Sequence, residues 1–460
     1  MFYLRSLIFI LVLNISSSYA GLDKAPPSFI VDDKKAIWID FINAKYNLSF
    51  DLMSKKSTSI ATIEFEIREK GYPIFDIVGK PSSVIMDGVG YGDIEINTPG
   101  FESKVRIINR ELSPGTYTVR IVTPISRGVK FGRGNVSVGF FNKDMRDRHF
   151  LERYIPTNYE YDQYKMEILI KIIGSSKKHR LFTNGHLVET SGNTFHFTYP
   201  EYFTSSSLYF HLVPKNKFKV LEFVYESRLR NGRDFPVTIY SKMMRLSRKV
   251  KKKVIKVLRE LEGDYGPWPH PELTFYADGK WKGGMEYAGA ATSGWFAIGH
   301  ELQHNYFARA VMPANGNAGW VDEAVASWRD FYTLNKLFSF GRVRMNYVSM
   351  NLGNQSVYNR KSDIRSYKSG RSFIFYLDSL LKKSQGKSFK KFLKKYFENR
   401  KYTVIDSEDF RLDLERYSGR SFKKLFDQYI YGLDHRDKSI SSDDHSFHTP
   451  LSDEEIWDLI

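Results

Sequence analysis

The chain has 460 residues, 42% of them hydrophobic and 15% aromatic, which excludes an intrinsically disordered protein and predicts two or three folded domains. It contains no cysteine, which excludes disulfides, thiolate metal sites and a cysteine nucleophile. The formal net charge is +17, but no groove-reading motif accompanies it, so we do not expect a nucleic-acid partner.

The chain begins with features of a cleavable secretory signal peptide over residues 1–20. Arg5 precedes an apolar run from Leu7 to Leu13, and small residues follow at Ser18 and Ala20, where cleavage is expected. A membrane anchor is the less favoured alternative, because a spanning helix needs about 20 apolar residues. We therefore expect an exported protein, either periplasmic or secreted, and the lack of cysteine favours a bacterial envelope.

Alternation of apolar and polar residues predicts strands over most of residues 21–232. Examples are "ATIEFEIRE", "GTYTVRIVTP" and "KMEILIKIIG", and Gly, Pro, Asn and Ser separate them in the manner of turns. The sequence therefore predicts an N-terminal β-sandwich-like domain.

After Arg233 the apolar residues recur every three or four positions, which predicts helices. The predicted helices cover 237–263, 293–311, 320–339, 366–383 and 387–398. The segment "ELTFYAD" is a predicted strand at the centre of this half. The expected fold class is thus multidomain α+β, in which a mainly helical domain over 233–385 and its helical end over 386–435 precede an acidic tail over 436–460.

Much of the positive charge lies in "RLSRKVKKKVIKVLRE" and "KKSQGKSFKKFLKKYFENRK". Both segments carry apolar residues at helical spacing, so they are predicted to be solvated helix faces. Such faces would also be attracted to an anionic envelope surface. No feature of the sequence indicates an oligomeric state.

The segment "AIGHELQHNYF" carries the clearest chemical signal. Positions i and i+4 of a helix lie on one face, so His300 and His304 can direct imidazole nitrogens at one zinc ion. Glu301 lies one position round the helix, where it is a candidate general base for a water molecule. A solvated helix face is the alternative, but the apolar neighbours of the two histidines indicate a buried helix.

A catalytic zinc site needs a third protein ligand, and Glu323 in "GWVDEAVASW" is the candidate. The turn-forming segment "MPANGNAG" would let a second helix double back and present this carboxylate to the ion. An ordinary surface carboxylate is the alternative. Ser327, one turn further on, is a candidate hydrogen-bond partner for a ligand, although a plain buried serine is favoured there.

The motif His-Glu-x-x-His followed by eighteen residues and Glu, with "GGMEY" at 283–287, resembles the aminopeptidase N family of gluzincin zinc peptidases. "HELQHNYFARAV" is similar to the family's His-Glu-Leu-Ala-His-Gln-Trp-Phe-Gly-Asn-Leu-Val, "WVDEAVAS" to its Trp-Leu-Asn-Glu-Gly-Phe-Ala, and "YKSG" at 367–370 to its Tyr-x-Lys-Gly. The similarity covers most of 236–432. It implies a thermolysin-like catalytic domain with one zinc ion and peptide substrates.

The resemblance implies further roles for individual residues. Glu286 would bind the free α-amino group of the substrate, and the backbone of Gly283, Gly284, Met285 and Glu286 would lie along the peptide as an added strand. Tyr367 would stabilise the oxyanion. The alternatives are a glutamate without a role and, since the chain has 29 tyrosines, an ordinary aromatic residue.

Three departures from the family pattern leave the specificity open. Tyr287 replaces the family's asparagine, the connection from Glu286 to His300 is short, and the sequence ends after the catalytic domain. We expect an exported zinc aminopeptidase. The alternatives are a glycyl-aminopeptidase-like enzyme or an endopeptidase, and a non-catalytic envelope binding protein that kept a peptidase fold.

Overall fold

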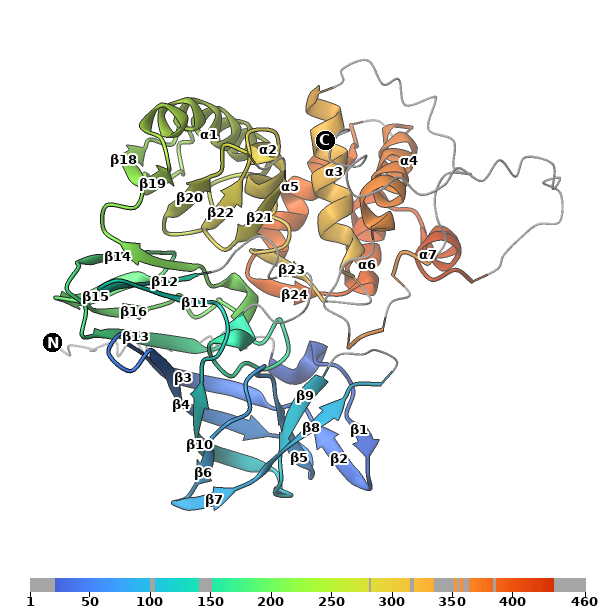
Figure 1. The fold of residues 1–460 in the computed structure, drawn as a ribbon. Helices are drawn as coiled ribbons and strands as arrows, with labels where there is room; N and C mark the ends of the chain where they lie inside the picture. Colours follow the sequence, from blue (N-terminus) through green and yellow to red (C-terminus); the bar gives the residue numbers. More distant parts are fainter. Residues whose placement is uncertain are drawn as a thin grey trace, which may run out of the picture.

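The computed structural model describes residues 21–99, 104–139, 151–280, 283–314, 318–334, 351–353, 356–358, 364–383 and 386–433. The expected signal peptide and acidic tail lie outside these residues. Figure 1 shows a strand-rich N-terminal half, coloured blue to green, beside a half in which helices surround a further sheet. None of the helices within the described ranges combines the length and apolar character needed to cross a bilayer.

Within the described residues, the N-terminal half forms three sheets. The largest has the strand order β15-β16-β13-β3-β4-β10-β6-β7, and the others have the orders β1-β2-β5-β9-β8 and β11-β12-β17-β14. The strands span β1 Phe29–Val31, β2 Lys34–Ile37, β3 Asp40–Asp51, β4 Lys56–Ile67, β5 Tyr72–Phe75, β6 Ser83–Met86, β7 Val89–Tyr91, β8 Asp93–Asn97, β9 Lys104–Ile108, β10 Gly115–Pro124, β11 Val129–Gly132, β12 Asn135–Gly139, β13 Lys165–Ile173, β14 His179–Thr183, β15 His186–Ser191, β16 Thr194–Thr198 and β17 Phe210–Pro214.

Alternation along the strands builds the core of this half. In β4, Ile63 and Phe65 are fully buried while the residues between and beside them are more accessible. They share one hydrophobic cluster with Ile121 of β10 and Leu212 of β17, so the eight-stranded and four-stranded sheets pack over a common core. The β-rich N-terminal region is as the sequence predicts.

The second half is built on a sheet of order β18-β19-β20-β22-β21. Its strands are β18 (Lys219–Tyr225), β19 (Phe235–Ser241), β20 (Leu273–Ala277), β22 (Ala290–Ser293) and β21 (Gly284–Tyr287). The segment predicted as a central strand is β20, in the middle of the sheet. Strand β18 lies in the range that the sequence assigns to the N-terminal domain, but it pairs with β19.

Two predicted helices are shorter than expected. The helix predicted over 237–263 is α1, which begins at Met244, because the β-branched and aromatic residues before it form β19. The helix predicted over 293–311 is reduced to α2 (Ile298–Gln303), and Val311–Pro313 form β23, parallel to β24 (Thr403–Ile405). The backbone turns between them at Ala308, whose φ of 155° is not helical.

Helices cover the sheet and complete the second core. They are α1 (Met244–Tyr265), α2 (Ile298–Gln303), α3 (Trp320–Leu334), the π-helical turn η7 (Ser366–Gly370), α4 (Arg371–Lys382), α5 (Phe389–Arg400), α6 (Ser407–Ser418) and α7 (Lys423–Tyr429). Val254 and Leu258 of α1 are fully buried in one cluster with Phe275 of β20 and Leu302 of α2. This packing fixes α2 against the sheet.

Polar contacts join the two halves near the site. His270 donates from Nε2 to the carbonyl of Asn305 at 3.0 Å, and its Nδ1 accepts from the Tyr202 hydroxyl at 3.1 Å. Gln163 donates to the carbonyls of Tyr202 and Tyr402. At another point Lys24 in η1 (Gly21–Lys24) pairs with Asp406, the residue that caps the start of α6.

Candidate metal centre and active site

Helix α2 holds the two histidines of the predicted metal site. Ile298 and Leu302 are fully buried in the core, so the rotation of the helix about its axis is fixed by packing. His304 follows the last residue of α2 with helical φ and ψ of −59° and −21°. His300 and His304 therefore point to the same side, and both are buried.

Helix α3 brings Glu323 to the pair formed by His300 and His304. The Nε2 atoms of His300 and His304 are 3.0 Å apart, and Glu323 Oε2 lies 3.2 Å from the first and 3.4 Å from the second. Two ligands of a tetrahedral zinc site with bonds of ~2.0 to 2.1 Å are about 3.3 Å apart. The three atoms are therefore spaced as the ligands of one zinc ion would be.

Asp330 supports His300 from behind. Its Oδ2 accepts a hydrogen bond from Nδ1 of His300 at 2.8 Å, which leaves Nε2 of the same ring free to bind a metal. Burial alone would lower the pKa of His300, but Asp330 and Glu323 outweigh it and raise that pKa well above its ordinary value. The Ser327 hydroxyl is buried without a hydrogen-bond partner among the described residues, so it does not hydrogen-bond a metal ligand in this structure.

Glu301 lies beside strand β21. A Cβ on Gly284 would stand 2.1 Å from Glu301 Oε1, so only glycine leaves room for this carboxylate. The neighbouring Gly289 N–H donates to the Asn305 side chain at 2.8 Å, which ties the turn after β21 to the end of α2. Burial, reinforced by the charge of Glu286, raises the pKa of Glu301 to about 8, in the range suited to a general base.

Tyr367 reaches the same centre from the π-helical turn η7. Its hydroxyl donates to Glu323 Oε1 at 2.6 Å, and its ring stacks on that of His300 with 6.1 Å between centroids. Gly370 lets η7 approach α3, since a Cβ there would meet the Ala324 Cβ at 2.7 Å. A π-helical turn is itself a frequent feature of functional sites.

Glu286 in β21 has a partner that the sequence analysis did not anticipate. Its Oε1 accepts a hydrogen bond from Nη2 of Arg309 at 2.7 Å, and both side chains are buried. The resemblance assigned this carboxylate to a substrate amine. In the structure it forms an ion pair within the protein.

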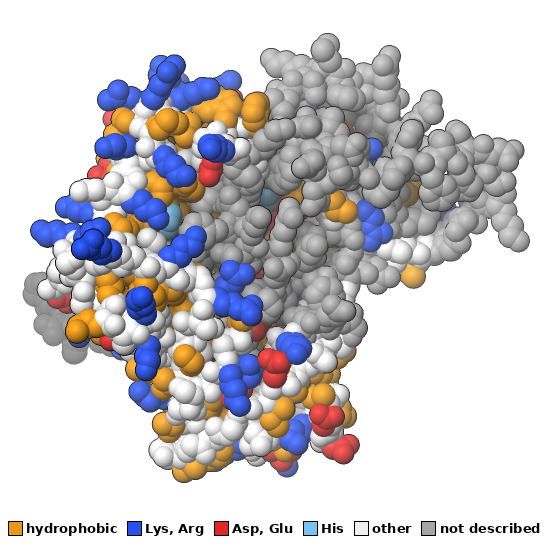
Figure 2. All heavy atoms as spheres, in the orientation of Figure 1, with side chains coloured by type: hydrophobic (Ala, Val, Ile, Leu, Met, Phe, Trp, Pro, Cys, Tyr) orange, Lys and Arg blue, Asp and Glu red, His pale blue; other side chains and the backbone are white. Residues whose placement is uncertain are grey.

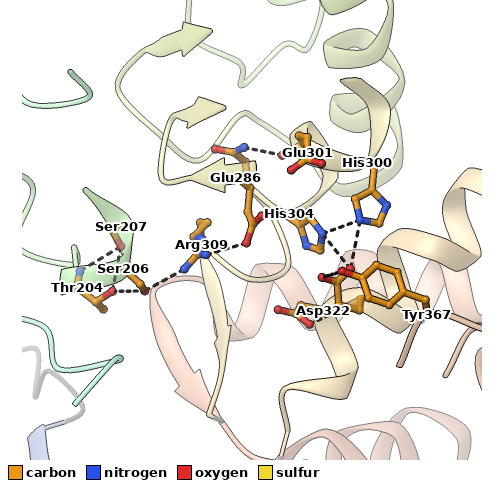
Figure 3. A network of polar contacts seen from close by, with 12 residues as sticks. Thr204, Ser206, Ser207, Glu286, His300, Glu301, His304, Arg309, Asp322 and Tyr367 are labelled. Atoms are coloured by element: carbon orange, nitrogen blue, oxygen red, sulfur yellow. Dashed lines mark hydrogen bonds and ion pairs between the residues drawn. The ribbon is translucent and has the colours of Figure 1, made fainter. Parts of the chain in front are cut away.

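The structure therefore brings Glu323 and strand β21 to the same place as four residues that Figure 3 labels, namely His300, Glu301, His304 and Tyr367. Their roles remain predictions.

Sequence reasoning missed Asp330 and Arg309. Asp330 lies seven positions after Glu323, on the same face of α3, and this spacing was an available signal. Arg309 carried no comparable signal, because its contact with Glu286 depends on the irregular turn at Ala308.

The fold is shared with two-domain M1 zinc metallopeptidases. An M1 zinc metallopeptidase from Deinococcus radiodurans, in a mutant bound to a Tyr-Ser-Ala substrate, matches with a TM-score of 0.62 and 13% identity over 85% of this chain and 94% of its own. A second solved structure, of a two-domain M1 zinc metallopeptidase mutant bound to L-arginine, matches with a TM-score of 0.61 and 14% identity, covering 86% of this chain and 94% of its own.

Yeast LTA4 hydrolase has the same fold. It matches with a TM-score of 0.63 and 15% identity, covering 86% of this chain and 69% of its own. No family model and no curated protein matches the sequence. At these identities the likeness establishes the fold, and function must be argued from the site.

Proposed function

We propose that the protein is a zinc-dependent peptidase that binds one zinc ion per chain through His300, His304 and Glu323. The observation that carries this proposal is the triangle of 3.0, 3.2 and 3.4 Å between their nitrogen and oxygen atoms, beside the carboxylate of Glu301. The fold shared with zinc metallopeptidases supports it.

The chain's own groups have distinct parts in peptide hydrolysis. A bound zinc ion supplies Lewis-acid chemistry by lowering the pKa of water to about 7 and polarising the scissile carbonyl. Glu301 accepts a proton from the attacking water and returns it to the leaving amine, so one carboxylate serves as base and then as acid. The Tyr367 hydroxyl, which donates to Glu323 in this structure, would turn its one O–H to the oxygen on which negative charge develops.

Strand β21 is the candidate binding edge for the peptide. It is the last strand of its sheet, so the backbone of Gly283 to Glu286 can pair with an extended substrate on its free side. Gly284 keeps this edge close to Glu301.

Removal of a residue from a free amino end is one activity that this proposal allows. It is supported by the resemblance at 283–287 and by the Tyr-Ser-Ala substrate bound to the Deinococcus radiodurans mutant. A glycyl-aminopeptidase-like or endopeptidase activity is the alternative.

The test is hydrolysis of aminoacyl amides and peptides by the purified chain from Gly21, with metal content measured on the same sample. We expect about one zinc per chain, activity that a chelator removes, and recovery when zinc is restored. Bound zinc without hydrolysis of any peptide would favour the non-catalytic binding protein. Absence of bound metal would remove the proposed function.

We also propose that the protein acts outside the cytoplasm, as a periplasmic or secreted enzyme. The composition of residues 1–20 supports export. Lys and Arg side chains are spread over the face around α1 in Figure 2, where Arg245, Arg248 and Lys252 are exposed, and they would favour an anionic envelope surface. Cell fractionation with an antibody to the mature chain tests the location.

A further inference from the structure

Glu286 does not present a free carboxylate to the site. One of its oxygens is bonded to Arg309 at 2.7 Å, and the two side chains are 9% and 3% exposed. Figure 3 shows this carboxylate between Arg309 and His304, on the side of β21 where the metal ligands lie. A group that binds Glu286 from the metal side must therefore share it with a buried guanidinium.

The position of Arg309 is set by the chain around it. Its Nη1 donates to Ser206 Oγ at 2.9 Å and its backbone N–H to the His304 carbonyl at 3.0 Å. Ala308 before it has a φ of 155°, a conformation that favours glycine, so the contacts on either side must hold it. Within the described residues the Nε–H is buried without a partner, which leaves Glu286 as the one carboxylate bonded to the guanidinium.

Arg309 keeps its charge in this setting. A guanidinium is not deprotonated in proteins, and the Glu286 carboxylate bonded to its Nη2 at 2.7 Å stabilises the positive charge. The pair with Glu286 is thus a true ion pair with no net charge.

We infer that Arg309 is a specificity-determining residue that cancels the charge of Glu286, so that the enzyme does not require a free ammonium group on its substrate. An incoming ammonium is attracted by Glu286 and repelled by the adjacent guanidinium. The inference rests on the proposed peptidase function. The substrates expected from it are peptides with a blocked amino end and longer peptides that are cleaved at internal bonds.

The first test uses the zinc-loaded mature protein without any mutation. A fluorogenic hexapeptide and its N-acetylated counterpart are compared by kcat/KM, and mass spectrometry of the products locates the cleaved bond. We expect the free form to be preferred by less than about tenfold, because like charges disfavour the ammonium. A preference of tenfold or more for the free form would overturn the inference.

Two variants then test whether Arg309 is the cause. Arg309→Asn removes the charge, and we expect the free-to-acetylated ratio of kcat/KM to rise at least about tenfold over the wild type. Arg309→Lys keeps the charge and should leave the ratio within about threefold. Equal free-to-acetylated ratios in the Arg309→Asn and Arg309→Lys variants would overturn the role of Arg309 in specificity.

If Arg309→Asn does not fold, Glu286→Gln provides the second measurement. In the wild type the charge of Glu286 is already cancelled by Arg309, so Glu286 contributes little to amine recognition. We therefore expect Glu286→Gln to change the free-to-acetylated ratio of kcat/KM by less than about threefold. A fall of tenfold or more would show that Glu286 selects the amine after all. Failure of the zinc-loaded wild-type protein to cleave either peptide would instead reject the peptidase function.

Discussion

Glu301 is the residue on which the proposed chemistry depends. Its carboxylate is buried beside the proposed metal ligands, and an amide in its place cannot accept a proton. Glu301→Gln should lower kcat by about 10²- to 10⁴-fold and leave the zinc content unchanged, as measured by peptide hydrolysis and elemental analysis. Glu222→Gln, on an exposed position of β18, is the control and should behave as wild type. Retained turnover in Glu301→Gln would remove the base assignment.

Asp330 should control how tightly zinc is held. The hydrogen bond from His300 Nδ1 to Asp330 orients the ring, and its loss weakens the ligand. Asp330→Asn should reduce zinc affinity by about 10- to 100-fold in competition with a chelator. Ser327→Ala on the same helix is the matched control, because the Ser327 hydroxyl has no partner in the described part of the chain. Equal affinities in the two variants would contradict this role.

Among the elements, β21 and α2 are tied by close contact. A Cβ at Gly284 would overlap the Glu301 carboxylate, so Gly284→Ala should displace that side chain, lower kcat and leave zinc bound. Gly263→Ala in α1 is the matched control, since no atom lies within 4 Å of its added Cβ, and it should be slightly more stable. Peptide hydrolysis and thermal melting check both. Unchanged kcat in Gly284→Ala would mean that β21 can move away.

Sequence reasoning found those parts of the site that depend on regular periodicity. His300 and His304 were predictable because helical spacing alone places them on one face, and Glu323 because a turn separates two helical patterns. The contact between Arg309 and Glu286 was not predictable, because it depends on the irregular turn at Ala308 and on Ser206 in the 3-10 helix η4 (Ser205–Ser207) of the N-terminal half. Helix ends were also misplaced where strand-forming residues adjoin a helix, as at 237–241.

For the whole molecule, two buried histidines predict loss of stability in acid. Burial lowers the pKa of His211 and of His270 to about 3, whereas the unfolded chain protonates these groups near pH 6.5. Protons therefore bind the unfolded state preferentially between these values, and stability falls as pH drops below 6.5. The loss from pH 6.5 to 5.5 should be about 1 kcal/mol for each histidine.

Urea unfolding at the two pH values measures this loss. His270→Gln cannot be protonated in this range, so its stability should fall less between pH 6.5 and 5.5 than that of the wild type. His186→Gln is the control, because His186 is exposed on β15. The same pH dependence in all three proteins would contradict the prediction for His270, which lies at the junction of the two halves.

Lys24 links the beginning of the described chain to one of its last helices. Its Nζ lies 2.6 Å from Asp406 and 2.9 Å from Asp409, the two residues that cap the start of α6. Since 382 positions separate Lys24 from Asp406, this bridge forms only after nearly all of the chain has been synthesised. The segment around Lys24 therefore cannot be anchored to α6 until that helix has been made, so this ion pair joins the two ends of the described chain late in folding.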